Sequence, residues 1–307
     1  MSLEELQKKW NCKNVSIVKG EGGLTKVVLT NRQSSLEVYL MGATITAYKV
    51  GSRDVIFTSK QSKFESLKAI RGGVPLIYPQ FGPGKMQQHG FARNVDWEVL
   101  STLVKEQEDL VQLNLSIHES EYTQKVCGDA DIKFQCTFTI KLNVDRLELQ
   151  YESKNTGQKA YDFQLALHTY YQIASIHKAH VTGLKGFEYI DKTRQMALTK
   201  ETADSIQITE ETDRVYKNCT TSPLELVDTV NQTKVILHSP DNSLKDVVVW
   251  NPWIEKAKAM SDFGDLEYLE MICIEYGNID KPIVLQPGQT FTGRHTIQPT
   301  SIQQSSL

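Results

Sequence analysis

Two ionisable residues interrupt apolar runs of the sequence, where a charge is costly to bury. His168 lies within the run 163–171, and Glu275 ends the run that begins at Met271. Imidazole can donate or accept a proton near neutral pH, and burial raises the pKa of a carboxyl toward the range of a general base. The two residues could therefore act as an acid and a base. By residue type alone, a lone histidine in an apolar strand is more often a hydrogen-bonded core residue, and a strand-end glutamate is more often exposed.

The segment 70–97, IRGGVPLIYPQFGPGKMQQHGFARNVDW, contains the other candidate side chains. Three prolines and five glycines interrupt it, so we expect an irregular loop whose backbone can approach a ligand closely. Its basic, imidazole and amide side chains include Arg71, Lys85, His89, Arg93, Gln80, Gln87 and Gln88. Guanidinium groups bind phosphate oxygens in a bidentate manner, so the loop is a candidate phosphate site. A solvated basic loop with salt bridges to other segments is the alternative.

No residue pattern indicates a metal, a cofactor or a different nucleophile. His177 and His180 are close in sequence, but no Asp, Glu or Cys neighbour completes a metal-binding set. No GxSxG motif occurs, and the segment 183–186 is too short for a phosphate-binding loop. The five cysteines are widely spaced without a CxxC pair, so we expect them to be reduced, with Cys136 and Cys273 as small core residues. We therefore expect neither a metal nor a cofactor.

The elements that must position these residues are predicted to be β-strands. Apolar residues recur at every second position, and strands are expected over 26–29, 36–50, 111–117, 138–142, 147–151, 235–238, 247–250, 271–275 and 290–297. Residues 143–146 supply a hairpin turn. Helices are few, and Ser2 with Glu5 forms a capping-box pattern ahead of a short helix that ends at Trp10. The pattern indicates an all-β protein, an antiparallel β-sandwich.

The composition is typical of a folded protein that binds neither nucleic acid nor a membrane. The 307 residues are 40% hydrophobic and 23% charged, with a formal net charge of -3, so a large core is available and no basic excess attracts nucleic acid. No run approaches the roughly twenty apolar residues of a membrane span, and the charged N-terminus is unlike a signal peptide. Because no linker divides the chain, we expect one domain over 1–307 with a flexible tail at 298–307. We also expect a cytoplasmic monomer.

The segments that carry these candidates resemble those of the aldose 1-epimerase, or galactose mutarotase, superfamily, in particular its hexose-6-phosphate (glucose-6-phosphate) 1-epimerase branch. The resemblance covers nearly the whole chain and is carried, in order, by RGGVPLIYPQFGP, QHGFARNVDW, LALHTYY, GLKGFEYIDKT, ETDRVY, VVWNPWIEKAKAMSDF and MICIEYGN. Each motif alone is weakly specific, whereas their shared order is strongly specific. The resemblance implies the galactose-mutarotase-like β-sandwich, or supersandwich, with few short helices and no metal or redox cofactor.

The resemblance also implies roles for individual residues. His168 corresponds to the family's general acid, Glu275 to its general base and Asp213 to a ligand of a substrate hydroxyl. The substrate site is expected to include Arg71, Gln88, His89 and Arg93, with the two arginines holding the 6-phosphate. The sequence departs from the family pattern at Tyr276, next to Glu275, where a smaller residue or proline is common.

The function implied is the interconversion of the α and β anomers of a hexose 6-phosphate, such as D-glucose 6-phosphate. Ring opening removes a proton from the anomeric hydroxyl and adds one to the ring oxygen, so it needs a base and an acid. Two other functions stay open: a catalytically silent carbohydrate-binding or sugar-sensing protein on the same sandwich, and an epimerase of unphosphorylated aldoses. The first would not need His168 and Glu275 together, and the second would not need Arg71 and Arg93 together.

Overall fold

The chain folds mostly into antiparallel β-sheet, as its residue pattern predicts. The structure, a computed structural model, describes residues 1–128, 132–220 and 223–302. Within those ranges the α-helices are short: α1 (Leu3–Trp10), α2 (Glu121–Cys127) and α3 (Trp253–Ala259). None of them is long and apolar enough to cross a membrane. Single turns of 3₁₀ helix lie at Glu21–Gly23, Ala92–Asn94, Glu106–Glu108, Ile176–Lys178, Lys192–Arg194 and Glu267–Leu269.

A five-stranded sheet follows α1 and runs in sequence order. Its strands are β1 (Val15–Lys19), β2 (Thr25–Asn31), β3 (Ser34–Tyr39), β4 (Thr44–Val50) and β5 (Arg53–Asp54). The predicted capping box of α1 is confirmed, because Ser2 Oγ accepts a hydrogen bond from the Glu5 N–H while Glu5 Oε2 accepts one from the Ser2 N–H. The single strand expected over 36–50 is wrong. A turn at Gly42 and Ala43, with φ of 67° and 47°, divides it into β3 and β4.

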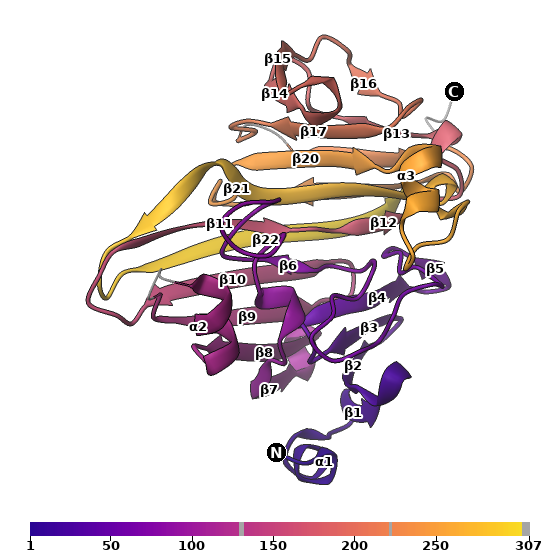
Figure 1. Cartoon of the computed structure of the whole chain (residues 1–307). Helices are drawn as coiled ribbons and strands as arrows, with labels where there is room; N and C mark the ends of the chain where they lie inside the picture. The colour runs from indigo at the N-terminus through magenta and orange to yellow at the C-terminus, as the bar shows by residue number, and fades with distance from the viewer. Residues whose placement is uncertain (129–131, 221–222, 303–307) are drawn as a thin grey trace.

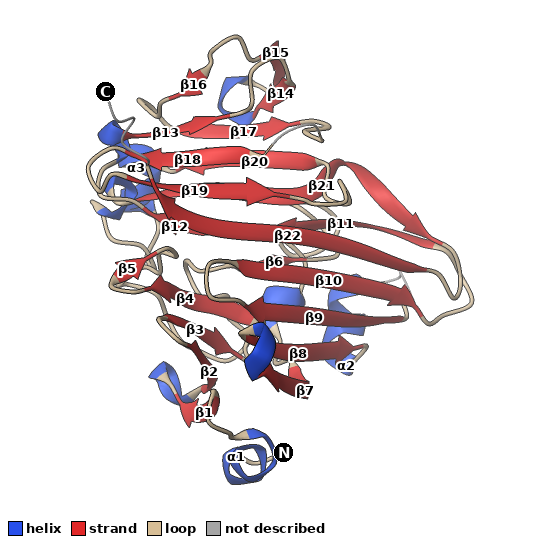
Figure 2. Cartoon of the chain, turned by 180° about the vertical axis from the view of Figure 1, so that it is seen from behind, coloured by secondary structure: helices blue, strands red, loops and turns tan. Residues whose placement is uncertain are grey.

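Two larger sheets lie one over the other. Figure 1 looks onto the eight-stranded sheet, and Figure 2 looks onto the nine-stranded sheet from behind. In spatial order, the nine-stranded sheet contains β16 (Ser205–Ile206), β13 (Ala179–Thr182), β18 (Leu224–Asp228), β19 (Thr233–His238), β22 (Thr290–Ser301), β10 (Leu147–Asn155), β9 (Phe134–Leu142), β8 (Leu110–His118) and β7 (Glu98–Lys105).

The eight-stranded sheet carries the candidate site. Its strands are β15 (Ala197–Lys200), β14 (Glu188–Asp191), β17 (Thr212–Tyr216), β20 (Asp246–Asn251), β21 (Met271–Leu285), β11 (Tyr161–Leu167) and β6 (Leu76–Ile77), with β12 (Tyr170–Gln172) also paired to β21. All of these pairings are antiparallel.

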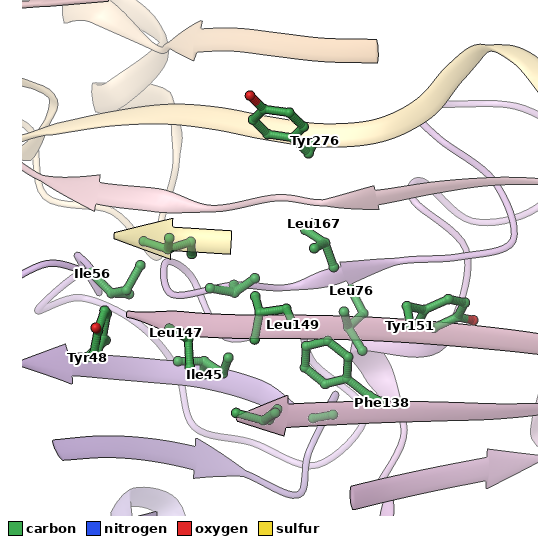
Figure 3. Packing of buried hydrophobic residues seen from close by; sticks show 14 of the residues in the cluster. Ile45, Tyr48, Ile56, Leu76, Phe138, Leu147, Leu149, Tyr151, Leu167 and Tyr276 are labelled. Atoms are coloured by element: carbon green, nitrogen blue, oxygen red, sulfur yellow. The ribbon is translucent and has the colours of Figure 1, made fainter. Parts of the chain in front are cut away.

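Side chains alternate between the two faces of the eight-stranded sheet, and β21 shows this most clearly. Ile272, Ile274 and Tyr276 belong to the large apolar cluster, which includes residues of both large sheets and of the five-stranded sheet. Figure 3 shows part of this cluster, with Tyr276 labelled. Met271 and Cys273 belong to a second apolar cluster on the other, outer face. Because both faces are covered over this stretch, the strand reads as one unbroken apolar run. The outer face is where the candidate residues meet.

Two further predictions concern the ends of strands. The predicted hairpin is confirmed, because β9 and β10 pair in register and the Asn143 N–H donates to the Arg146 carbonyl. The tail expected at 298–307 is shorter than predicted. Residues 298–301 continue β22 and pair with residues 233–236 of β19, while 303–307 lie outside the described residues.

Candidate active site

His168 and Glu275 lie opposite each other on neighbouring strands. After a register shift between Phe163 and Leu165, the end of β11 pairs with β21 in the same register as β12 does, which sets His168, between these two strands, opposite Glu275. The His168 N–H donates to the Pro75 carbonyl at 3.0 Å, which ties this break between β11 and β12 to the Pro/Gly segment. Because alternate residues of a strand share a face, both side chains project to the outer face. The contact therefore follows from strand pairing, although the two residues are remote in sequence.

The two side chains touch and are almost completely buried. His168 Nε2 lies 3.4 Å from Glu275 Oε1, and 10% and 2% of the two side chains are exposed. The remaining polar atoms, His168 Nδ1 and Glu275 Oε2, are buried without a hydrogen-bond partner among the described residues. Burial lowers the pKa of His168 well below its usual range, and His89 and Arg93 lower it further. Burial and the Asp213 carboxylate raise the pKa of Glu275 well above its usual range. Both shifts therefore favour the uncharged form of the group concerned.

Aromatic rings surround this pair. The Tyr170 ring stacks on the His168 ring with centroids 4.9 Å apart, and Trp250 stands edge-on to both rings at 5.9 Å. Strand pairing places Tyr170, Cys273, Trp250 and Asp213 in one row across four strands. Polar contacts are strengthened in such an apolar setting. Tyr170 could have been found from sequence, because it lies two residues after His168 and so shares its face.

Both predicted arginines reach the same face. Arg71 donates through Nε to Asp262 Oδ1 at 3.1 Å and through Nη1 to the Tyr170 hydroxyl at 3.3 Å. Arg93 donates through Nη2 to the Gln88 carbonyl at 3.1 Å, whereas its Nε is buried without a partner. Burial lowers the pKa of Arg93 to about 10, and the charge of Arg71 contributes to this. Gln88 is exposed, and its contact with Arg93 is made by its backbone carbonyl.

The Pro/Gly segment is irregular apart from the two-residue strand β6 and the 3₁₀ turn Ala92–Asn94, and it turns His89 toward the pair. His89 and Gly90 adopt φ of 69° and 68°, and a Cβ at Gly90 would lie 2.2 Å from the Tyr78 carbonyl oxygen. His89 Nδ1 accepts a hydrogen bond from the Gly82 N–H at 3.1 Å, so the ring proton resides on Nε2. Burial lowers the pKa of His89 to about 3. The neutral ring stands edge-on to His168 at 5.7 Å and offers an N–H donor.

Asp213 joins the site together with Lys192, which the sequence patterns did not single out. Lys192 Nζ lies 3.7 Å from Asp213 Oδ1 and 4.4 Å from the centroid of the Phe81 ring. Burial raises the pKa of Asp213, while Lys192 partly opposes this. The charge of Lys192 also partly offsets the rise in the Glu275 pKa, so Lys192 acts on the pair. An ion-pairing lysine leaves no periodic signal in a sequence, which explains why it was missed.

Tyr276 and Cys273 lie close to Glu275 along β21 and point to opposite faces of the sheet. Tyr276 points into the space between the sheets, where its hydroxyl donates to a carbonyl of β19 at 3.0 Å and its ring stacks on His295 at 4.4 Å. It therefore does not shape the outer face. Cys273 is a buried core residue, as expected, and belongs to the apolar cluster on the outer face beside the candidate site. His168, Cys273 and Glu275 each offer a metal-ligand atom within 4.8 Å of the others, a set that their spacing in sequence could not reveal.

Comparison with known proteins identifies the family. The sequence profile "Aldose 1-epimerase" matches residues 25–298. A Cenchrus ciliaris protein named "Putative glucose-6-phosphate 1-epimerase" is 34% identical over 295 residues, which cover 91% of this chain and 85% of that protein. An Escherichia coli (strain K12) protein of the same name is 32% identical over 258 residues, which cover 82% of each. The crystal structure of a "putative mutarotase" from Salmonella typhimurium superimposes with a TM-score of 0.85 at 26% identity and covers 94% of this chain and 95% of its own. The chain belongs to the aldose 1-epimerase family.

Proposed function

We propose that this protein interconverts the α and β anomers of a hexose 6-phosphate, with D-glucose 6-phosphate as the first candidate. The observation that carries the proposal is the buried contact of 3.4 Å between His168 Nε2 and Glu275 Oε1. A binding protein needs hydrogen bonds to its sugar but does not need an acid and a base in contact. Here the two groups are in contact, and their pKa values are shifted in opposite directions. Two relatives that are 34% and 32% identical are named for the glucose 6-phosphate reaction, which supports the choice of substrate.

The reaction requires two proton transfers at oxygens bonded to the same carbon. Glu275 as a carboxylate takes the proton of the anomeric hydroxyl while His168 as an imidazolium gives one to the ring oxygen, and the bond between C1 and the ring oxygen breaks. The product is the open aldehyde. Rotation about its C1–C2 bond presents the other face of the carbonyl. The two reverse transfers then close the ring as the other anomer and restore both groups.

The pair carries the same total charge throughout this cycle. The state that follows ring opening, a protonated Glu275 beside a neutral His168, is the one that the pKa shifts favour in the free protein. Moving one proton across the 3.4 Å contact converts it into the state that begins ring opening. Each form can therefore serve one half of the reaction, so neither half requires a proton from solvent.

The arginines support a phosphorylated substrate. Arg71 is fixed by Asp262 and Tyr170, whereas the buried Nε of Arg93 has no partner among the described residues. An unpaired buried donor is costly, and a phosphate oxygen would satisfy it with a charge-assisted hydrogen bond. Arg71 also contributes to the lowering of the Arg93 pKa, as expected of two like charges held near each other. We infer that this pair of guanidiniums holds the 6-phosphate.

Exchange NMR between the α and β anomer signals tests the proposal. We expect the protein to accelerate exchange of D-glucose 6-phosphate, and we expect a His168→Asn variant that binds the sugar phosphate to lose about 10²- to 10⁴-fold of that rate. Equal acceleration of free D-glucose would instead support an epimerase of unphosphorylated aldoses. Binding of the sugar phosphate without acceleration would support a silent sugar-binding protein and would refute the proposal.

We further infer that the chain acts as one domain and as a cytoplasmic monomer. The single-domain inference is supported by one apolar cluster that extends from Leu6 of α1 to Ile297 of β22 and includes residues of all three sheets. Light scattering after size-exclusion chromatography tests the monomer, and a single cooperative unfolding transition tests the single domain. Fractionation of cells tests the location.

A further inference from the structure

We propose that His168, Cys273 and Glu275 form a binding site for one soft divalent cation such as Zn²⁺, and that the bound ion blocks the acid/base pair. The binding half of this proposal rests on the geometry of the three side chains. The blocking half also rests on the proposed function, because it assumes that His168 and Glu275 transfer protons.

The three ligand atoms are already close to the positions that a metal requires. Zn²⁺ binds nitrogen, sulfur and oxygen at about 2.0 to 2.3 Å in tetrahedral geometry, which places ligand atoms roughly 3.3 to 3.8 Å apart. His168 Nε2 and Glu275 Oε1 are 3.4 Å apart, and all three ligand atoms lie within 4.8 Å of one another. Cys273 and Glu275 are two residues apart on one strand, and His168 faces them from the neighbouring strand. Small side-chain rotations would close the remaining gap.

The ligand chemistry selects the class of ion. A thiolate, an imidazole and a carboxylate are all zinc ligands, and three protein ligands with a fourth position left open form a familiar zinc arrangement. The thiolate disfavours Mg²⁺ and Ca²⁺, which prefer oxygen ligands. The fourth position would face the outer side, toward the exposed tenth of the His168 side chain. An ion there would occupy the lone pairs that the sugar reaction needs.

The protein leaves these ligand groups without competing partners. Glu275 Oε2 and His168 Nδ1 are buried with no hydrogen-bond partner among the described residues. Cys273 Sγ makes no hydrogen bond within the part of the chain that the structure describes, whereas Cys136 Sγ accepts one from Tyr151 at 2.9 Å. Buried polar groups without partners are uncommon, and a bound ion would supply a partner for the Glu275 carboxylate and the Cys273 sulfur, while His168 would bind it through Nε2.

The surrounding charges do not exclude a cation. Arg71, Arg93 and Lys192 are positive, while Asp213 and Asp262 are negative. Burial raises the pKa of both the Cys273 thiol and the Glu275 carboxyl, so the ion must displace their protons as it binds, and four anions then face three cations. Asp213 influences Glu275 more strongly than any of the cations does. A divalent ion is therefore attracted on balance, although less strongly than in a purely acidic site.

Cobalt absorption tests the site directly. Co²⁺ bound to a thiolate gives a near-ultraviolet charge-transfer band that hexaaqua Co²⁺ lacks. We expect one equivalent of Co²⁺ to produce this band in the wild-type protein and in the matched control Cys219→Ala, whose thiol is also buried but belongs to the cluster between the sheets. We expect Cys273→Ala to lack the band, and we expect Cys273→Ala and Cys273→Ser to bind Zn²⁺ at least tenfold more weakly by calorimetry. Absence of the band in the wild type, or equal Zn²⁺ affinity in the Cys273 variants, would overturn the site.

Inhibition tests the second half. With each variant normalised to its own rate in EDTA, we expect Zn²⁺ to inhibit anomer exchange competitively with the sugar phosphate in the wild type and in Cys219→Ala. Cys273→Ala should need at least tenfold more Zn²⁺ for the same inhibition. Inhibition that high substrate does not relieve would refute the blocking mechanism. A cobalt band in a protein that never accelerates exchange would refute the proposed function and leave the metal site in place.

Discussion

Replacing Glu275 by Gln should remove most of the activity and make the folded protein more stable at neutral pH. A general base contributes about 10²- to 10⁴-fold to a rate, so its loss should raise the barrier by about 2.7 to 5.5 kcal/mol. The stability change follows from burial, because the pKa of Glu275 is raised well above that of an unfolded glutamate. A carboxyl whose pKa is higher in the folded protein than in the unfolded chain contributes fully to stability below its pKa in the unfolded chain. That contribution is lost as the pH rises through its pKa in the folded protein, because the unfolded chain releases the proton first. The amide keeps the shape and cannot ionise, so it avoids this loss.

Urea unfolding at pH 7 and pH 5 measures the stability change, and exchange NMR measures the rate. The gain in unfolding free energy from Gln should be larger at pH 7 than at pH 5. Glu267→Gln is the matched control, because Glu267 is also buried but accepts hydrogen bonds from the Ser59 hydroxyl and from the N–H groups of Lys60 and Gly264. The control should lose roughly 1.5 to 3 kcal/mol of stability and keep its turnover per folded molecule. A Glu275→Gln protein that is destabilised like the control, or that keeps a tenth of the activity, would refute the reasoning.

Three other perturbations test separate parts of the structure. His168→Asn should lower the exchange rate about 10²- to 10⁴-fold. Because the two residues act together, the double variant with Glu275→Gln should exchange anomers only slightly more slowly than the slower single variant, and losses that add in free energy by exchange NMR would contradict this joint action. Arg93→Ala should raise KM for the sugar phosphate about 10- to 150-fold through loss of a charge-assisted hydrogen bond, and KM for free glucose much less; equal effects would remove the phosphate from the mechanism. Burial lowers the pKa of His295 from 6.5 to about 3. Below pH 6.5 the unfolded chain therefore binds a proton that the folded protein does not, and the free energy of unfolding falls by about 1.4 kcal/mol per pH unit. His295→Gln should lack this pH-dependent loss of stability when urea unfolding is compared at pH 7 and 4.5.

Strands whose side chains alternate were predictable, whereas the places where β-structure departs from that pattern were not. The hairpin of β9 and β10 follows directly from period-two burial. The turn between β3 and β4 was hidden, because Leu40, Met41 and Ala43 are buried like the strands on either side and Ala43 adopts a positive φ that favours glycine. The strand at 298–301 was missed for the opposite reason, since its backbone pairs with β19 although its side chains are polar.

The candidate pair was recognisable from sequence only through the resemblance. His168 and Glu275 each had a plainer interpretation when taken alone, and nothing in their spacing showed that the end of β11 and β12 pair with β21 in the same register. The irregular loop was predictable from its prolines and glycines, but its use of the Gln88 carbonyl was not. Asp262 and Lys192 were missed because ion pairs across loops depend on tertiary packing and leave no periodic pattern.

Because side chains alternate along β21, substitutions on its two faces have different consequences. Every second side chain, up to the ring of Tyr276, holds the sheets together and never meets a ligand, while the intervening ones face whatever lies outside. A lineage could retune its ligand by exchanging an outward residue such as Cys273 without disturbing the scaffold. A single inserted residue, by contrast, would rotate Glu275 into the interior and bring its neighbour outward. New specificities on this scaffold should therefore arise by substitution and loop growth, with the lengths of the central strands left unchanged.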